Sequence, residues 1–70
     1  MATLVKMWRE RRGLSLRQLS ERAGITFANI QRIETGAADP RLSTMERLAR
    51  ALDVTVHDLI PRTARRRGKR

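Results

Sequence analysis

Residues 15–36 read SLRQLSERAGITFANIQRIETG, and this stretch decides how the rest of the chain must fold. It contains two short helix patterns separated by a break at Gly24, Ile25 and Thr26. Ser15 is a residue type that caps helix N-termini. The apolar residues of the helix that follows recur at i, i+3 and i+4 spacing and would share one face: Leu16, Leu19 and Ala23.

The break itself predicts a sharp turn. Gly24 can adopt a positive φ and end the first helix of the pair. Ile25 can fill the corner, and Thr26 can cap the second helix, whose Ile30 and Ile33 would face inward. Two helices of this length joined by a glycine-containing turn have the layout of a helix-turn-helix. We interpret the other elements as support for this pair.

One helix is predicted before the pair, over residues 3–12. It would direct Leu4, Val5 and Trp8 toward the core, leave Met7 off that face and end at Gly13. After the pair, residues 35–40 predict a loop in which Gly36 ends the preceding helix and Pro40 disfavours helix at Asp39.

Two further helices are predicted after that loop. Ser43 and Glu46 have the spacing of a capping box, which would begin a fourth helix with an apolar stripe: Met45, Leu48, Ala49 and Leu52. Asp53-Val54 would end it. Thr55 and Asp58 form a second capping pattern that opens a short fifth helix. No strand pattern is present, so we expect an all-α fold of five short helices.

Length and composition bound the class of protein. Seventy residues make one domain, which we assign to residues 1–61, followed by a basic tail at 62–70 that should be disordered when free. No Cys and a single His exclude a disulfide and the usual zinc sites, so we expect no metal or cofactor. The chain has no apolar run of membrane-spanning length and no secretion signal, so the cytoplasm is the expected location.

The charge indicates a polyanionic partner. Sixteen Lys and Arg face seven Asp and Glu, for a net charge of +9, and six of these bases lie in residues 61–70 without an acid. Such an excess favours nucleic acid or an anionic membrane surface. A tail that only improves solubility is the alternative interpretation of this basic end.

The chain resembles the phage repressor/Cro-type helix-turn-helix domains across about residues 5–60. Five short motifs in the right order support this resemblance: RERRGLS at 9–15, AGIT at 23–26, IQRIETG at 30–36, DPRLST at 39–44 and LARALDVTVHDLI at 48–60. It implies a bacterial or phage five-helix DNA-binding domain. In such domains the third helix enters the major groove, usually in a homodimer on a palindromic operator.

The resemblance also implies which side chains contact DNA. The first two helical positions and the sixth of the recognition helix face base edges, and here they are Phe27, Ala28 and Arg32. Arg32 can pair bidentately with guanine, whereas Phe27 and Ala28 can offer apolar surface to a thymine methyl. Our candidates for the DNA backbone are polar or basic residues on and around this helix: Arg12, Arg17, Thr26, Asn29, Gln31 and Arg41.

Two features depart from the family pattern. Many relatives have Gln where this chain has Leu16, and some also where it has Phe27; we hypothesise that Leu16 and Phe27 pack on each other instead. Relatives often have Lys or Arg after the glycine of the loop, where this chain has Ala37 and Ala38. The expected grip on the phosphate backbone is therefore missing from that loop.

The resemblance further implies a structural ion pair between Arg9 and Glu34. A charge at either position has little room to reach water, so each should need the other. The alternative is an ordinary surface pair that contributes under about 1 kcal/mol.

The last helix predicts a dimer surface. Its apolar residues are too many for so short a helix to bury alone: Val54, Val56, Leu59 and Ile60. Some should cover the fourth helix and the rest a second copy, through an isologous contact. The alternative is that this helix only covers the core of a monomer.

No enzyme is expected, because the chain has no Cys or Tyr and His57 is its single histidine, so no nucleophile–base pair is available. The sequence favours a sequence-specific regulator of transcription, a repressor, that binds double-stranded DNA. An antitoxin or adaptor that acts mainly through a protein partner is the alternative. RNA binding is disfavoured because no aromatic stacking platform is present.

Overall fold

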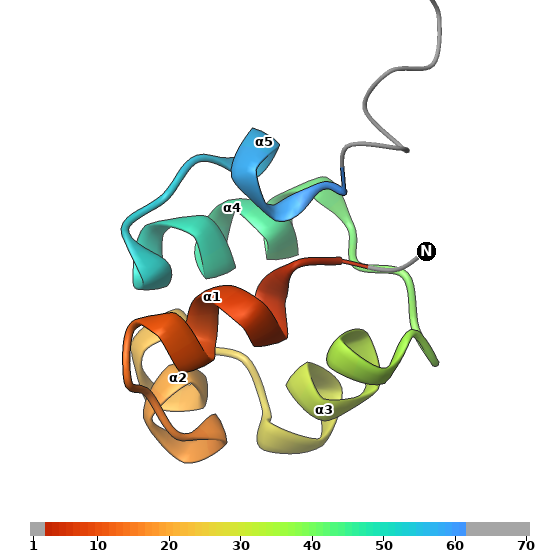
Figure 1. Cartoon of the computed structure of the whole chain (residues 1–70). Helices are drawn as coiled ribbons and strands as arrows, with labels where there is room; N and C mark the ends of the chain where they lie inside the picture. The colour runs from red at the N-terminus through yellow and green to blue at the C-terminus, as the bar shows by residue number, and fades with distance from the viewer. Residues whose placement is uncertain (1–2, 62–70) are drawn as a thin grey trace, which may run out of the picture.

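The computed structural model describes residues 3–61 and shows five α-helices in that range, with no strand. The helices are α1 (Val5–Arg11), α2 (Leu16–Ala23), α3 (Phe27–Thr35), α4 (Leu42–Leu52) and α5 (Val56–Leu59). In Figure 1, α2 and α3 lie on one side of α1, and α4 and α5 lie on the other. The predicted all-α fold is confirmed, whereas the tail at 62–70 lies outside the described residues.

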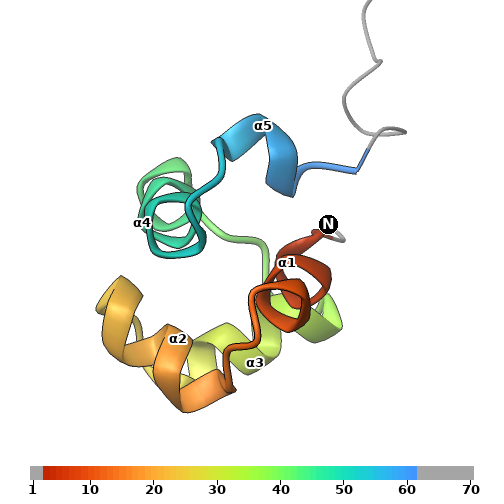
Figure 2. The same ribbon diagram turned by 60° about the vertical axis from the view of Figure 1, so that its left-hand side comes forward.

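The core takes its side chains from all five helices and from the turn between α2 and α3. Figure 2 shows α2 and α3 meeting below α4 and α1. The buried apolar residues are Val5, Leu19, Ala23, Ile25, Ile30, Ile33, Met45, Leu48, Ala49, Leu52 and Leu59. The inward faces expected for α3 and α4 are therefore confirmed. Of the residues expected to face inward from α1 and α2, Val5, Leu19 and Ala23 are buried, and Trp8 and Leu16 are partly buried against the core. Leu4 precedes α1 and is half-buried. Within residues 3–61, no helix is both long and apolar enough to cross a bilayer.

Local hydrogen bonds form the helix-turn-helix, and the predicted caps at Ser15 and Thr26 are among them. The Ser15 hydroxyl accepts from the Gln18 backbone N–H at 3.0 Å, and the Gln18 side chain accepts from the Ser15 N–H at 2.8 Å. Gly24 ends α2 with φ +69°, and the Thr26 hydroxyl caps α3 by accepting from the Asn29 N–H. The Ser20 hydroxyl also donates to the Ile25 carbonyl, which holds the turn closed.

The predicted start of α4 is wrong. The helix begins at Leu42 with Arg41 as N-cap and without a side-chain cap, so Ser43 lies inside the first turn. Pro40 disfavours helix only at the residue before it, and the chain can become helical soon after it. Starting earlier allows the Met45 N–H to bond the Arg41 carbonyl at 2.9 Å. That backbone bond takes the place of the expected capping box.

The fifth helix is attached to the start of α1. Its predicted capping box is present, with the Thr55 hydroxyl and the Asp58 carboxylate each accepting a backbone N–H of the other residue. The Leu4 N–H bonds the Leu59 carbonyl at 2.9 Å, and the Trp8 indole N–H bonds the Asp58 carbonyl at 3.1 Å. The beginning and the end of the described chain therefore pair with each other.

Replacing Gly24 with Ala should destabilise the domain by about 1 kcal/mol, the cost of a left-handed conformation for a residue with a Cβ. A Cβ at Gly24 would meet nothing closer than the Arg47 side chain at 3.7 Å, so steric overlap adds little. Urea denaturation measures the change. Gly13→Ala is the matched control. Gly13 has φ +71° with open space around it, so this change measures the cost of the left-handed conformation without a contact to Arg47. Equal stability of Gly24→Ala and the parent chain would contradict the prediction.

Candidate nucleic-acid interface

Helix α3 divides cleanly into a buried and an exposed face. Ile30 and Ile33 are buried in the core, so the opposite side faces solvent. Every residue of α3 that the sequence analysis assigned to DNA is exposed: Phe27, Ala28, Asn29, Gln31 and Arg32. Phe27 is 47% exposed, and Leu16 packs partly against the core. Packing between Leu16 and Phe27 stays a prediction.

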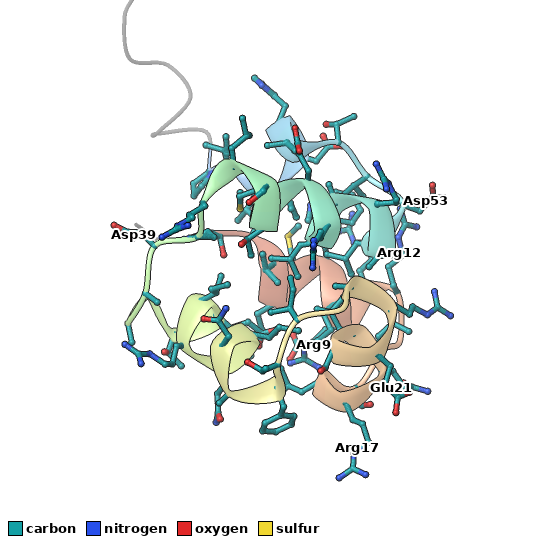
Figure 3. All side chains as sticks on the ribbon, turned by 180° about the vertical axis from the view of Figure 1, so that it is seen from behind. Arg9, Arg12, Arg17, Glu21, Asp39 and Asp53 are labelled. Carbon is teal, nitrogen blue, oxygen red and sulfur yellow. The ribbon has the colours of Figure 1, made fainter. Side chains whose placement is uncertain are left out.

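One flank of this surface is formed by the first turn of α2. Arg17 is exposed there, and in Figure 3 it points away from the body of the molecule on the side remote from α4. Neither Arg17 nor Arg32 makes an ion pair with any residue in the range 3–61. Both guanidinium groups are therefore free to meet an external anion.

The other flank is a hollow of about 190 Å³ between α3, the following loop and the start of α4. Its lining includes Asn29 and Arg41, two of the predicted backbone contacts, and adds Thr44 and the acidic Asp39. An amide, a guanidinium and a hydroxyl are the kinds of group that bond phosphate oxygens. Thr44 was missed in the sequence analysis, although it lies one helical turn after Arg41 and its side chain can follow on the same face.

Arg12 has a different environment. Its Nε donates to the Leu52 carbonyl at 2.9 Å and its Nη2 to the Asp53 carbonyl at 3.3 Å. The guanidinium also lies 5.2 Å from the centre of the Trp8 ring. Figure 3 shows Arg12 beside Asp53, far from Arg17. These donors stabilise the C-terminus of α4, so we omit Arg12 from the proposed phosphate contacts.

An ion pair fixes the far end of α3. Arg9 Nε lies 2.7 Å from Glu34 Oε2, and Arg9 Nη2 lies 3.3 Å from Oε1, so the pair is bidentate. The Arg9 and Glu34 side chains are only 13% and 5% exposed. The hydrogen bond to Glu34 raises the pKa of the Arg9 guanidinium above its usual value. Arg9 Nη1 also bonds the Leu14 carbonyl at 2.9 Å, which joins α1, α3 and the segment before α2.

The predicted dimer surface needs one correction. Leu59 is fully buried in the core, so it cannot meet a second copy. The Thr55 cap and the bond from Leu4 orient α5 so that Leu59 points inward. Val54, Val56 and Ile60 are half-buried and keep part of their surface in solvent.

Comparison with known proteins identifies the fold and the family. A family model described as helix-turn-helix matches residues 5–59, nearly the whole described chain. The chain belongs to the repressor/Cro-type helix-turn-helix family. It is 33% identical over 57 residues to the transcriptional regulator SinR of Bacillus subtilis, a match that covers 80% of this chain and 51% of SinR. It spans only 24% of another relative, the regulator y4dL of Sinorhizobium fredii.

Solved structures agree with this assignment. SinR in complex with DNA matches with a TM-score of 0.73 and 33% identity, over 76% of this chain and 86% of that one. SinR in complex with SinI gives 0.79 and 32%, over 84% and 58%. The restriction–modification controller protein C.AhdI of Aeromonas hydrophila gives 0.75 and 26%, over 77% and 82%. These relatives are regulators and DNA-binding domains, not enzymes.

Arg9→Ala or Glu34→Ala should each lower the free energy of unfolding by about 3 kcal/mol, because each strands the partner's charge in a largely buried place. Thermal and urea denaturation measure the loss. Arg9→Met combined with Glu34→Leu is the control: removing both charges together should recover much of the stability. Single variants that unfold like the parent chain would show that the pair contributes no more than a surface contact.

Proposed function

We propose that this chain binds a specific double-stranded DNA sequence and regulates transcription as a repressor in the cytoplasm. The observation that supports this best is the exposed face of α3, held by buried Ile30 and Ile33 and by the Glu34 ion pair. A recognition helix must be rigid if its side chains are to meet base edges at fixed positions. The structure of SinR in complex with DNA, which matches this chain with a TM-score of 0.73, supports DNA binding by this fold.

Each exposed side chain of α3 has a distinct chemical role in this proposal. Arg32 pairs with the O6 and N7 of a guanine, a contact that discriminates by about 1–3 kcal/mol. Phe27 and Ala28 cover a thymine methyl, because neither can form a side-chain hydrogen bond. Recognition of the base sequence therefore combines one polar contact with one apolar contact per half-site.

The surrounding groups fix the orientation on the duplex. Arg17 holds a phosphate from the start of α2, and a second backbone contact lies in the hollow between α3 and α4, which Asn29 and Arg41 line. Thr26 and Gln31 are further backbone contacts at the edges of α3. Backbone contacts of this kind set register and affinity without reading sequence.

A homodimer would present two such helices to a palindromic operator. Val54, Val56 and Ile60 lie around α5 and remain partly exposed, so an isologous contact can bury them. The two recognition helices would then reach half-sites about 34 Å apart, one turn of DNA. The binding free energies of the two half-sites would then add, so the dimer would bind the whole operator more tightly than one domain binds one half-site.

The alternative is an antitoxin or adaptor that acts mainly through a protein partner. The apolar Phe27 and Ala28 and the lack of a base at Ala37 and Ala38 favour it, because they reduce the polar contacts available to DNA. Selection from random duplexes followed by footprinting distinguishes the two functions. A protected palindrome at physiological salt supports the regulator, and weak binding without sequence preference supports the adaptor.

Arg32→Ala should weaken operator binding by about 1–3 kcal/mol and relax the preference at one base pair per half-site, because only the guanine contact is lost. Competition of single-base operator variants measures both effects. Arg17→Ala is the matched control: it should weaken all sequences alike and reduce the salt slope by about 0.9. Uniform weakening by Arg32→Ala would instead assign Arg32 to the backbone.

Val56→Lys should convert a dimer to a monomer, because burying a charge in a two-fold contact places like charges opposite each other. Light scattering at micromolar concentration measures the mass, and circular dichroism checks that the helices persist. Lys6→Glu, an exposed change on α1, should leave the mass unchanged. If the parent chain is already monomeric at these concentrations, the dimer proposal is wrong.

A further inference from the structure

A second hollow lies between the last turn of α2 and the C-terminal half of α4, and the functions proposed so far do not use it. It encloses about 320 Å³ and is lined by Arg22, Ala23, Arg47, Arg50 and Ala51. None of the exposed residues of α3 belongs to this lining. The hollow is therefore a separate feature of the surface.

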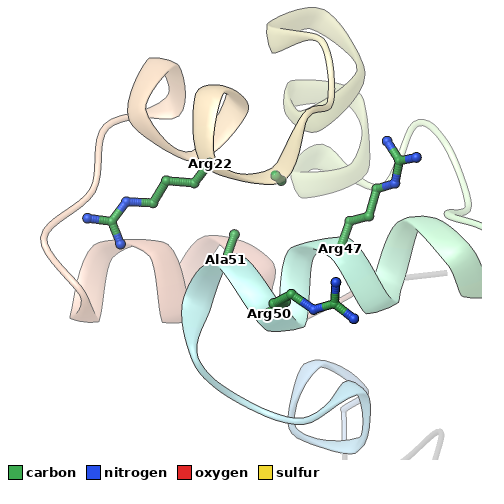
Figure 4. A pocket seen from close by; sticks show the side chains of 5 residues that line it. Arg22, Arg47, Arg50 and Ala51 are labelled. Atoms are coloured by element: carbon green, nitrogen blue, oxygen red, sulfur yellow. The ribbon is translucent and has the colours of Figure 1, made fainter.

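The lining has two chemically different parts. Ala23 and Ala51 contribute methyl groups, and Figure 4 shows Ala51 pointing across the hollow toward α2. Three arginines surround these methyls, and no acidic residue lines the hollow. The only hydrogen bond made by the side chains of these arginines within residues 3–61 is a long one, 3.4 Å, from Arg47 to the Gly24 carbonyl. The hollow therefore has an apolar floor and a rim of three positive charges.

The direction of the arginines indicates the size of the occupant. Figure 4 shows the head groups of Arg22 and Arg47 on opposite sides of the hollow, pointing away from each other. Such groups cannot close together on a single small anion. They can meet acidic groups that are spread along a chain, since each guanidinium pairs with one carboxylate.

The candidates for this occupant differ in charge and in apolar content. The chain's own residues 62–70 carry only basic charges and would be repelled by the rim. A DNA backbone offers the right charge, but its apolar groups are the ring CH and CH₂ of deoxyribose, which cannot extend into the hollow as a single apolar side chain can. An acidic polypeptide with one apolar side chain matches both parts of the hollow.

We infer that this hollow is a docking site for an acidic segment of another protein, with one leucine-sized side chain seated between Ala23 and Ala51. The carboxylates on either side of that residue pair with Arg22, Arg47 and Arg50. Because Arg47 also touches the turn before α3, the bound segment lies beside the recognition helix. This inference is independent of the proposed operator contacts, since it uses other residues.

The test uses the full chain labelled with nitrogen-15 and two synthetic ten-residue peptides. Both consist of Asp and Glu with one central residue, leucine in one peptide and serine in the other. We expect the leucine peptide to shift the backbone amide signals of Ala23 and Ala51 saturably and to bind at least fivefold more tightly than the serine peptide.

Variants locate the binding site. Arg22→Gln combined with Arg50→Gln should weaken the leucine peptide at least tenfold; glutamine avoids placing a negative charge in the last turn of a helix. Lys6→Gln combined with Arg17→Gln removes the same charge outside the hollow and should change peptide binding less than twofold. Thermal unfolding of both double variants verifies the fold, and DNA binding by the Arg22 and Arg50 variant should be unchanged.

Several results would overturn the inference. Equal binding of the two peptides, or equal weakening by the two double variants, would show diffuse attraction to a basic protein. Saturable shifts of Ala23 and Ala51 by inorganic phosphate would show a small-anion site. The same shifts caused by duplex DNA would assign the hollow to the nucleic-acid interface, and no shift with either peptide would leave no docking site.

Discussion

Helix α3, the proposed recognition helix, is held in position by the pairing of Arg9 and Glu34 near its C-terminal end. Arg9 donates three hydrogen bonds, two to the Glu34 carboxylate and one to the Leu14 carbonyl, so one side chain fixes α3 and the segment leading to α2 relative to α1. A domain of this size has a small core, and apolar packing alone is non-directional. The bidentate pair adds the direction that packing lacks.

The exposed surface around α3 combines apolar side chains with few basic ones. The front of α3 combines an apolar Phe27 and Ala28 with one guanidinium, and the loop after it has no base at Ala37 or Ala38. In the proposed DNA complex, the phosphate contacts lie on the two flanks, at Arg17 and at the hollow beside Arg41. Affinity in that complex would depend on the geometry between the flanks and α3, because each contact alone is weak.

Helix α4 connects the functions assigned to this small domain. Its N-terminus completes the hollow beside α3, and its C-terminal half forms the arginine-rimmed hollow with α2. Arg12 caps its end and stacks against Trp8, whose indole in turn bonds α5. Trp8 and Arg12 thus connect α5, and the half-buried residues around it, to the helix that lines both hollows. In our proposals, DNA binds on the α3 side of the domain and other partners approach elsewhere.

The sequence alone determined what depends on neighbours along the chain. The caps at Ser15, Thr26 and Thr55 and the glycine at the turn follow from interactions within four residues, and the structure contains them. The spacing of apolar residues likewise predicted which faces of α3 and α4 are buried. The Arg9–Glu34 pair was foreseen from the family resemblance. Tertiary structure alone decided the burial of Leu59, the capping role of Arg12 and both hollows. Each of these depends on segments distant in sequence, whose contact is fixed only when the whole core packs.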